Sequence, residues 1–186
     1  MCGEKKKPSL LDYIYSQMNI TSTIIFVNTR NYAVKLTSYM RERGHSVSII
    51  MGGDMHKEER DEIMQKFREG KTKVLISTDL LSRGIDVLEV NLVVNYDIPF
   101  KPNKFDPTQV EVNHETYLHR VGRTARYGRT GVAITFVANY RDEEFLNKIS
   151  DFYKVDIQEL KKEDVGKLIE LSMNSNQSLQ DDILNF

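Results

Sequence analysis

Short apolar runs alternate along the chain with segments in which apolar residues recur at helical spacing. The apolar runs are rich in β-branched and aromatic residues, which is typical of strands that are buried in a parallel sheet. The runs that predict strands are Thr23–Val27, Val47–Met51, Lys73–Ser77, Leu92–Tyr96 and Val132–Val137.

Amphipathic segments between and around these runs predict helices. They are Ser9–Met18, Asn31–Arg43, His56–Glu69, His114–Arg126, Asp142–Phe152 and Gln158–Leu171. Gly44 and Gly70 follow the second and third segments, where a glycine commonly ends a helix. This alternation predicts a doubly wound α/β fold with a mainly parallel sheet and helices on both faces. Ligands bind such sheets at the carboxyl ends of the strands.

Two segments depart from the alternation. Residues 98–113 contain three of the four prolines and no clear periodicity, so we expect a long surface loop there. Residues 172–186 are polar and predict a partly disordered tail. We expect residues 1–8 to form a linker and residues 9–171 to form the one domain.

The composition of the 186 residues, with 28% charged and 40% hydrophobic, is that of a soluble globular domain. The net charge of −1 excludes a general attraction to polyanions, so any such site must be local. The single cysteine, Cys2, favours a reducing intracellular setting. No apolar stretch approaches the roughly 20 residues of a membrane span, so we expect no membrane insertion. The basic run Met1–Lys7 lacks the apolar core of a secretory signal.

The most informative segment is His119–Arg129, in which four arginines recur at every third position. A guanidinium carries a permanent charge and a rigid fork of donors that suits phosphate oxygens. On a helix, His119, Arg123 and Arg126 would share one face, within roughly 60° of one another. The residues that would pack on a core from the other side are Leu118, Val121 and Ala125. The pattern predicts a cationic face directed at a polyanion.

Two further clusters follow strand candidates. In Ser77–Asp86, Thr78 and the next backbone N–H groups could hold a phosphate at a helix start. Gly84 permits a close contact, and Asp86 could accept hydrogen bonds from ribose hydroxyls.

In residues 52–60, Gly53 would let a polymer backbone come close, and Arg60 could contact a phosphate. At the end of the first strand, Asn28 could cap the next helix.

Each cluster also has a purely structural explanation. The arginine run could be a surface helix with capping arginines, and Asp79 could pair with Arg83 in a capped turn. The acids of residues 52–60 could simply favour the positive end of a helix. The chain has no G-x-x-x-x-G-K-[ST] phosphate loop, no acidic pair at a strand end and no Cys/His spacing for zinc. The phosphates and the metal of a nucleotide would therefore be held mainly by another domain.

Taken together, four blocks resemble the C-terminal RecA-like domain of DEAD-box RNA helicases, in order and in spacing. They are IIFVNTR (24–30), GGDMHKEER (52–60), STDLLSRGID (77–86) and HRVGRTARYGR (119–129), which resemble motifs IV, IVa, V and VI. The resemblance implies a RecA-like fold and an ATP-dependent RNA helicase that is a monomer. ATP, with Mg²⁺ held mainly by the N-terminal RecA-like domain, would lie between the two domains. The fragment alone would be inactive.

The resemblance also implies residue roles. Arg126 would be the arginine finger on the γ-phosphate, and Arg123 would make a second contact to it. Gly84 and Asp86 would contact the sugar side of the nucleotide, and His119 would couple to the acidic motif of the other domain. The residues expected along the RNA backbone are Thr78, Gly53, Arg60, Arg30, Asn28 and Lys57. Such contacts position RNA without selecting its sequence.

Three positions depart from the family pattern. Ala125 stands where motif VI usually has glycine, and Ser82 stands where motif V usually has alanine. Lys57 stands where motif IVa usually has glutamine, which puts one RNA contact in doubt or makes it sensitive to salt.

The long segment before motif VI and the segment 145–171 resemble the mRNA-export helicases of the nuclear pore. That resemblance implies location in the cytoplasm and nucleus, at the cytoplasmic face of the pore. It also implies two partners, an activator that carries inositol hexakisphosphate and a nucleoporin. The alternatives are a translation-initiation helicase, a non-catalytic RNA-binding scaffold and a DNA-directed relative. Intact Arg123, Arg126 and Asp86 argue against the scaffold.

Overall fold

A five-stranded parallel sheet forms the centre of the molecule. The computed structural model describes residues 2–17, 22–52, 55–78, 90–106, 108–124 and 131–166. The sheet has the strand order β2-β3-β1-β4-β7, and every neighbouring pair is parallel. The strands are β1 (Thr23–Phe26), β2 (Val47–Ile50), β3 (Val74–Ser77), β4 (Leu92–Asn95) and β7 (Val132–Thr135). All five predicted strands are therefore confirmed.

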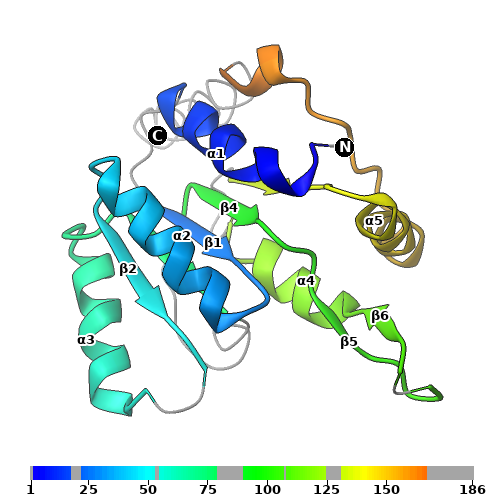
Figure 1. The fold of residues 1–186 in the computed structure, drawn as a ribbon, viewed down its shortest axis with the longest axis horizontal. Coiled ribbons are helices and arrows are strands. Elements are labelled where there is room, and N and C mark those ends of the chain that lie inside the picture. The colour runs from blue at the N-terminus through cyan, green and yellow to red at the C-terminus, as the bar shows by residue number, and fades with distance from the viewer. Residues whose placement is uncertain are drawn as a thin grey trace, which may run out of the picture.

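Helices alternate with these strands (Figure 1). They are α1 (Lys7–Ser16), α2 (Arg30–Glu42), α3 (Lys57–Arg68), α4 (His114–Val121) and α5 (Tyr140–Tyr153), with a short 3-10 helix, η1 (Glu4–Lys6), before α1. Gly44 and Gly70 have φ angles of 83° and 69°, which residues with a side chain rarely adopt. They lie just beyond α2 and α3, so the predicted glycine ends are confirmed.

Both faces of the sheet are covered. Ile25 and Val27 point to the side that holds α1 and α2, where the largest apolar core lies. Ile24 and Phe26 point to the opposite side and pack with Met64 and Phe67 of α3. Because successive strand residues alternate between faces, a strand that is apolar throughout is buried on both sides. The doubly wound α/β prediction is confirmed.

The segment predicted as a long irregular loop instead contains a β-hairpin. Strands β5 (Phe100–Pro102) and β6 (Val110–Val112) pair antiparallel, and the Lys101 ammonium lies 3.3 Å from the Glu111 carboxylate. The hairpin extends to one side of the sheet, next to α4 and α5 (Figure 1). Val112 packs into a separate small core with residues of α4 and α5. Strands of three residues are too short to show a clear alternation, which explains the wrong prediction.

Two predicted helices differ from the structure by more than two residues at one end. The helix expected over His114–Arg126 ends at Val121, with Gly122 as its C-cap. Leu118 is 50% exposed, so its predicted packing on a core was wrong, whereas Val121 packs against the small core. The helix expected over Gln158–Leu171 does not begin at residue 158: residues 155–161 are not helical, the 3-10 turn η3 (Lys162–Asp164) follows, and residues 165 and 166 are helical. Residues beyond 166, including the expected tail, lie outside the described part.

The start of the chain packs on the domain instead of leading away from it. Residues 4–8, which we expected to belong to a linker, are helical. The Cys2 backbone N–H donates to the Val137 carbonyl at 2.7 Å, which ties this segment to the residues just after β7. The side chain of Lys7 is buried.

Candidate nucleotide and RNA site

The carboxyl edge of the sheet gathers the segments that the sequence singled out. Strands β2, β3 and β1 are neighbours in that order, and they end just before Gly52, Thr78 and Asn28. The Thr78 N–H donates to the Ile50 carbonyl at 3.2 Å, and the Gly52 N–H donates to Thr78 Oγ1 at 3.1 Å. The ends of β2 and β3 are therefore fixed to each other at this edge.

Thr78 is only 8% exposed, and its hydroxyl oxygen accepts the hydrogen bond from Gly52. A hydroxyl group has one hydrogen and two lone pairs, so it can still donate one hydrogen bond to an acceptor such as a phosphate oxygen. Gly53, the expected glycine of close approach, lies outside the described residues.

Three basic side chains expected to contact RNA lie on the two helices that start at this edge. Arg30 is the first residue of α2, whose N-cap Thr29 accepts a hydrogen bond from the Tyr32 N–H. Lys57 is the first residue of α3, and Arg60 follows in the same turn. Arg30 and Lys57 are exposed, and Arg60 is partly exposed. The structure therefore brings these cations to the edge that also carries Thr78.

Asn28 does not cap α2, contrary to the prediction, because Thr29 does. Its side-chain Nδ2 donates to the Ile98 carbonyl at 2.8 Å, and its Oδ1 accepts from the Arg120 guanidinium at 3.2 Å. Its backbone N–H donates to Asp97 Oδ2 at 3.0 Å. Asn28 thus joins the end of β1 to the segment after β4, and one N–H and one lone pair of its side-chain amide remain for RNA.

Arg120 lies inside the protein and not on a cationic surface. It is fully buried, and one guanidinium nitrogen donates to the Asp97 carbonyl at 2.7 Å. The guanidinium carbon lies 5.0 Å from the centre of the Phe26 ring, within the range of a cation–π interaction. Arg120 therefore has a structural role, unlike the other arginines proposed to face a polyanion.

His119 and Arg123 flank this buried arginine. The imidazole of His119 is partly exposed and makes no hydrogen bond or ion pair with the described residues. Arg123 lies in the turn after α4, where its carbonyl accepts from the Val90 N–H at 3.2 Å, and only 9% of the residue is exposed. Arg123 thus connects α4 to the start of the fourth strand. Arg126, Gly84 and Asp86 lie outside the described residues.

Sequence reasoning missed Lys7 and Asp97, which contact this group of residues. The Lys7 ammonium lies 3.1 Å from Asp97 Oδ1, and Asp97 binds both Asn28 and Arg120. Lys7 follows two other lysines, Lys5 and Lys6, so nothing in the sequence separates the buried lysine from the exposed ones. Nothing in the sequence around Asp97 indicates its contacts, apart from its place directly after a predicted strand.

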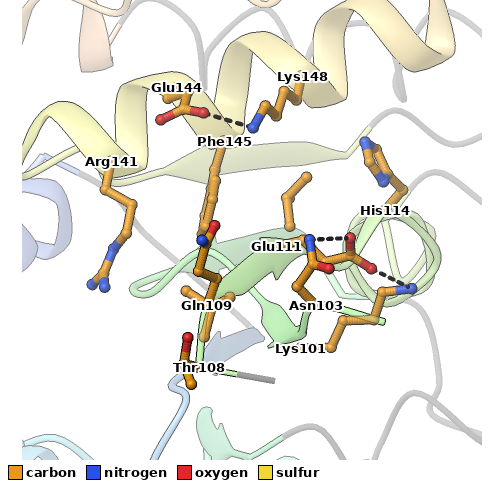
Figure 2. Close-up of a pocket in the computed structure, with 12 residues that line it drawn as sticks. Lys101, Asn103, Thr108, Gln109, Glu111, His114, Arg141, Glu144, Phe145 and Lys148 are labelled. Carbon is orange, nitrogen blue, oxygen red and sulfur yellow. Dashed lines mark hydrogen bonds and ion pairs between the residues drawn. The ribbon is translucent and has the colours of Figure 1, made fainter. Parts of the chain in front are cut away.

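A separate hollow of about 760 Å³ lies between the hairpin and α5 (Figure 2). The Lys101 ammonium and the Asn103 amide both approach Glu111, and Lys148 pairs with Glu144 at 2.6 Å on α5. None of the predicted nucleotide or RNA residues lines this hollow. It is therefore not part of the candidate site.

No cluster of three or more His, Cys, Asp or Glu side chains suited to a metal ion occurs among the described residues. None of the helices in that part of the chain is long and apolar enough to cross a membrane.

Comparisons with known proteins show which family the chain belongs to. The family model of the helicase conserved C-terminal domain matches residues 5–128. The ATP-dependent RNA helicase dbp-5 of Neurospora crassa is 44% identical over 162 residues, which are 87% of this chain and 32% of that protein. Eukaryotic initiation factor 4A-9 of Nicotiana tabacum is 48% identical over 157 residues, which are 84% of this chain and 34% of that protein. The chain thus spans about a third of the length of these relatives.

Solved structures agree. The C-terminal domain of the DEAD-box protein Dbp5 matches with a TM-score of 0.79 and 37% identity over 93% of each chain. S. cerevisiae Dbp5 bound to RNA and ADP BeF3 matches with a TM-score of 0.81 and 37% identity, over 93% of this chain and 43% of that one. The chain therefore belongs to the helicase conserved C-terminal domain family, as a C-terminal RecA-like domain of the DEAD-box type.

Proposed function

We propose that this chain is the second RecA-like domain of an ATP-dependent RNA helicase, which unwinds RNA locally or remodels ribonucleoproteins. The observation that supports this best is the shared carboxyl edge of β2, β3 and β1, where Thr78, Lys57 and Arg30 lie. ATP and RNA would together favour a closed arrangement of two domains, which is a shift between existing populations.

On the nucleotide side, Arg126 would be the arginine finger and Arg123 a second contact to the γ-phosphate. Gly84 and Asp86 would contact the sugar side, and His119 would couple to the other domain. The guanidinium of Arg123 and the imidazole of His119 suit phosphate and acidic partners, whereas neither group suits Mg²⁺. We therefore assign Mg²⁺ mainly to the other domain. Since Arg123 is 9% exposed here, its side chain or its surroundings must shift to reach a phosphate on that domain.

On the RNA side, Thr78, Gly53, Arg60, Arg30 and Lys57 would follow the sugar–phosphate backbone. Contacts of this kind depend on salt and not on base sequence. Asn28 would contribute mainly by holding the end of β1, because its amide already binds Ile98 and Arg120.

We further propose a role in mRNA export at the cytoplasmic face of the nuclear pore. Solved Dbp5 structures that match this chain include complexes with Gle1 and IP6, and with Nup159. An inositol hexakisphosphate-bound activator and a nucleoporin would then be partners of the whole protein. A pull-down with a Gle1-type activator and inositol hexakisphosphate tests this role, and no detectable complex would contradict it.

A translation-initiation function is the second candidate. Initiation factors 4A-9 and 4A-8 of Nicotiana tabacum are 48% and 49% identical to this chain, so identity alone does not separate the two groups. Capture of an initiation scaffold instead of an export activator would favour this candidate. A scaffold without catalysis would bind RNA without any ATP turnover.

One experiment tests the catalytic proposal. ATP hydrolysis is measured with this chain alone and with the chain joined to a first RecA-like domain that has a phosphate loop, each with and without RNA. We expect turnover, stimulated by RNA, only for the joined protein. Clear turnover by the purified chain alone would contradict the proposed division between the two domains.

A further inference from the structure

Lys7 is a buried charge that the proposed contacts to RNA and ATP do not use. Its side chain is 2% exposed, although burying an unpaired ammonium is costly. The ammonium lies 3.1 Å from Asp97 Oδ1 and 3.1 Å from Glu4 Oε2, and 5.2 Å from the centre of the Tyr96 ring. Burial lowers the pKa of Lys7, but the Asp97 and Glu4 carboxylates together outweigh this effect, so the pKa lies above its usual value. Lys7 therefore remains charged inside the protein.

Asp97 connects this charge to the proposed site in three ways. One carboxylate oxygen binds Lys7, and the other accepts the Asn28 backbone N–H at 3.0 Å. Its backbone carbonyl accepts from the Arg120 guanidinium at 2.7 Å. A change in the position of Asp97 would therefore alter its hydrogen bonds to Asn28 at the end of β1 and to Arg120 at the end of α4.

We propose that Lys7 is a positioning residue for the ATPase, which acts through Asp97 on Asn28 and Arg120. The inference rests on the proposed function for its catalytic consequence. Arg123 lies one turn beyond Arg120, and its N–H donates to the Arg120 carbonyl at 3.2 Å. By holding Arg120, the Lys7–Asp97 pair fixes the turn that carries Arg123 toward the nucleotide. Because Lys7 opens α1, before β1 in the chain, it also couples the start of the domain to this turn.

The roles of the two acids beside Lys7 differ. Glu4 is 58% exposed and makes no hydrogen bond or ion pair with Asn28 or Arg120 in the described part of the chain, so its pairing with Lys7 is screened by water. Asp97 is largely shielded and touches both. Lys7→Met keeps most of the buried stem and removes the charge, which leaves the Asp97 carboxylate free to rotate away from Asn28. Lys5→Met is the matched control, because Lys5 is an exposed lysine of η1, two residues before Lys7.

The first test measures amide chemical shifts of this chain by NMR. The isolated C-terminal domain of Dbp5, which this chain resembles, has been solved as a separate structure. Lys7→Met is expected to shift the backbone amides of Asn28 and Arg123 and the guanidinium N–H signals of Arg120, whereas Lys5→Met leaves them unchanged. If Lys7→Met does not fold, Asp97→Asn provides the same comparison. Shifts confined to Glu4 and Asp97 would overturn the proposal.

The second test uses the chain joined to a first RecA-like domain. Since a misplacement of about 1 Å can cost on the order of a hundredfold in rate, Lys7→Met should lower the RNA-stimulated kcat at least tenfold. The KM for ATP should change less than twofold, because the other domain holds most of the nucleotide. Lys7→Arg, which keeps the charge, should recover at least half of the kcat. Equal losses in Lys7→Met and Lys7→Arg, or a loss in KM alone, would overturn the positioning role.

The two tests distinguish a failure of the proposed function from a failure of the positioning role of Lys7. An inactive wild-type joined protein contradicts the proposed function, whereas the chemical shifts still decide whether Lys7 controls Arg120 and Asn28. An active wild type with an unaffected Lys7→Met variant contradicts only the positioning role.

Discussion

The Arg120 guanidinium donates a hydrogen bond of 3.2 Å to Oδ1 of Asn28, although 92 residues separate the two in the chain. Arg120 also donates to the Asp97 carbonyl at 2.7 Å, and Asp97 in turn accepts the Asn28 N–H. The first and last recognised helicase motifs therefore meet inside the protein. The RNA side and the nucleotide side of the proposed site share one buried polar network.

Replacing Arg120 with methionine should destabilise the chain by about 3 kcal/mol. The substitution leaves the Asp97 carbonyl and the Asn28 amide buried without their charged donor, and such hydrogen bonds contribute about 1.5–3 kcal/mol each. Urea denaturation of the chain measures the loss. Arg141→Met is the control, because Arg141 is an exposed arginine on α5. Equal stability of the two variants would contradict a structural role for Arg120.

Thr78→Val should weaken both the sheet edge and RNA binding, whereas Thr78→Ser should do neither. Valine removes the oxygen that accepts the Gly52 N–H, at a cost of about 1 kcal/mol, while serine keeps it. Thermal unfolding and RNA titration of the joined protein measure the two effects. Equal stability and equal RNA affinity of Thr78→Val and Thr78→Ser would show that the Thr78 hydroxyl has no role in either.

Lys57→Gln should reduce the salt dependence of RNA binding. Each lost phosphate contact to a single strand lowers the slope of log K against log salt by about 0.7. Titrations of the joined protein with a short single-stranded RNA at several salt concentrations measure this slope. Lys148→Gln, on α5 beside the separate hollow, should leave the slope unchanged. An unchanged slope for Lys57→Gln would remove Lys57 from the RNA contacts.

Tyr15 should make the chain lose stability in alkali. Burial raises the pKa of its phenol above the ordinary value of 10, and this effect outweighs the opposing effect of the Thr23 hydroxyl. Above pH 10 the unfolded chain loses this proton while the folded chain retains it, so stability falls as the pH rises, by about 1.4 kcal/mol for each pH unit. Tyr15→Phe should show a shallower fall in urea denaturation between pH 9 and pH 11. Identical curves would mean that Tyr15 ionises freely in the folded protein.

The strands and their parallel arrangement could be predicted because each is a short, mainly apolar run, and β1, β3 and β4 are buried on both faces. The hairpin of β5 and β6 could not, because its strands have three residues and depend on contacts with α4 and α5. The extent of α4 was overestimated because helical spacing of arginines continues past Gly122, where the structure ends the helix.

Within the candidate site, sequence reasoning found the segments but not the network that joins them. Thr78, Arg30, Lys57 and Arg60 follow directly from their places after the strands. The burial of Lys7 and the triple role of Asp97 depend on pairs up to 90 residues apart, which local patterns do not contain.

The central claim is that this chain supplies an arginine finger to ATP held by another domain. The most direct measurement is RNA-stimulated ATP turnover by the joined protein with Arg126→Ala, compared with Arg141→Ala as a control outside the motif. We expect a loss of about 10³-fold or more for Arg126→Ala, with RNA binding and folding retained and the control near wild type. Turnover by Arg126→Ala within a few-fold of wild type would contradict it.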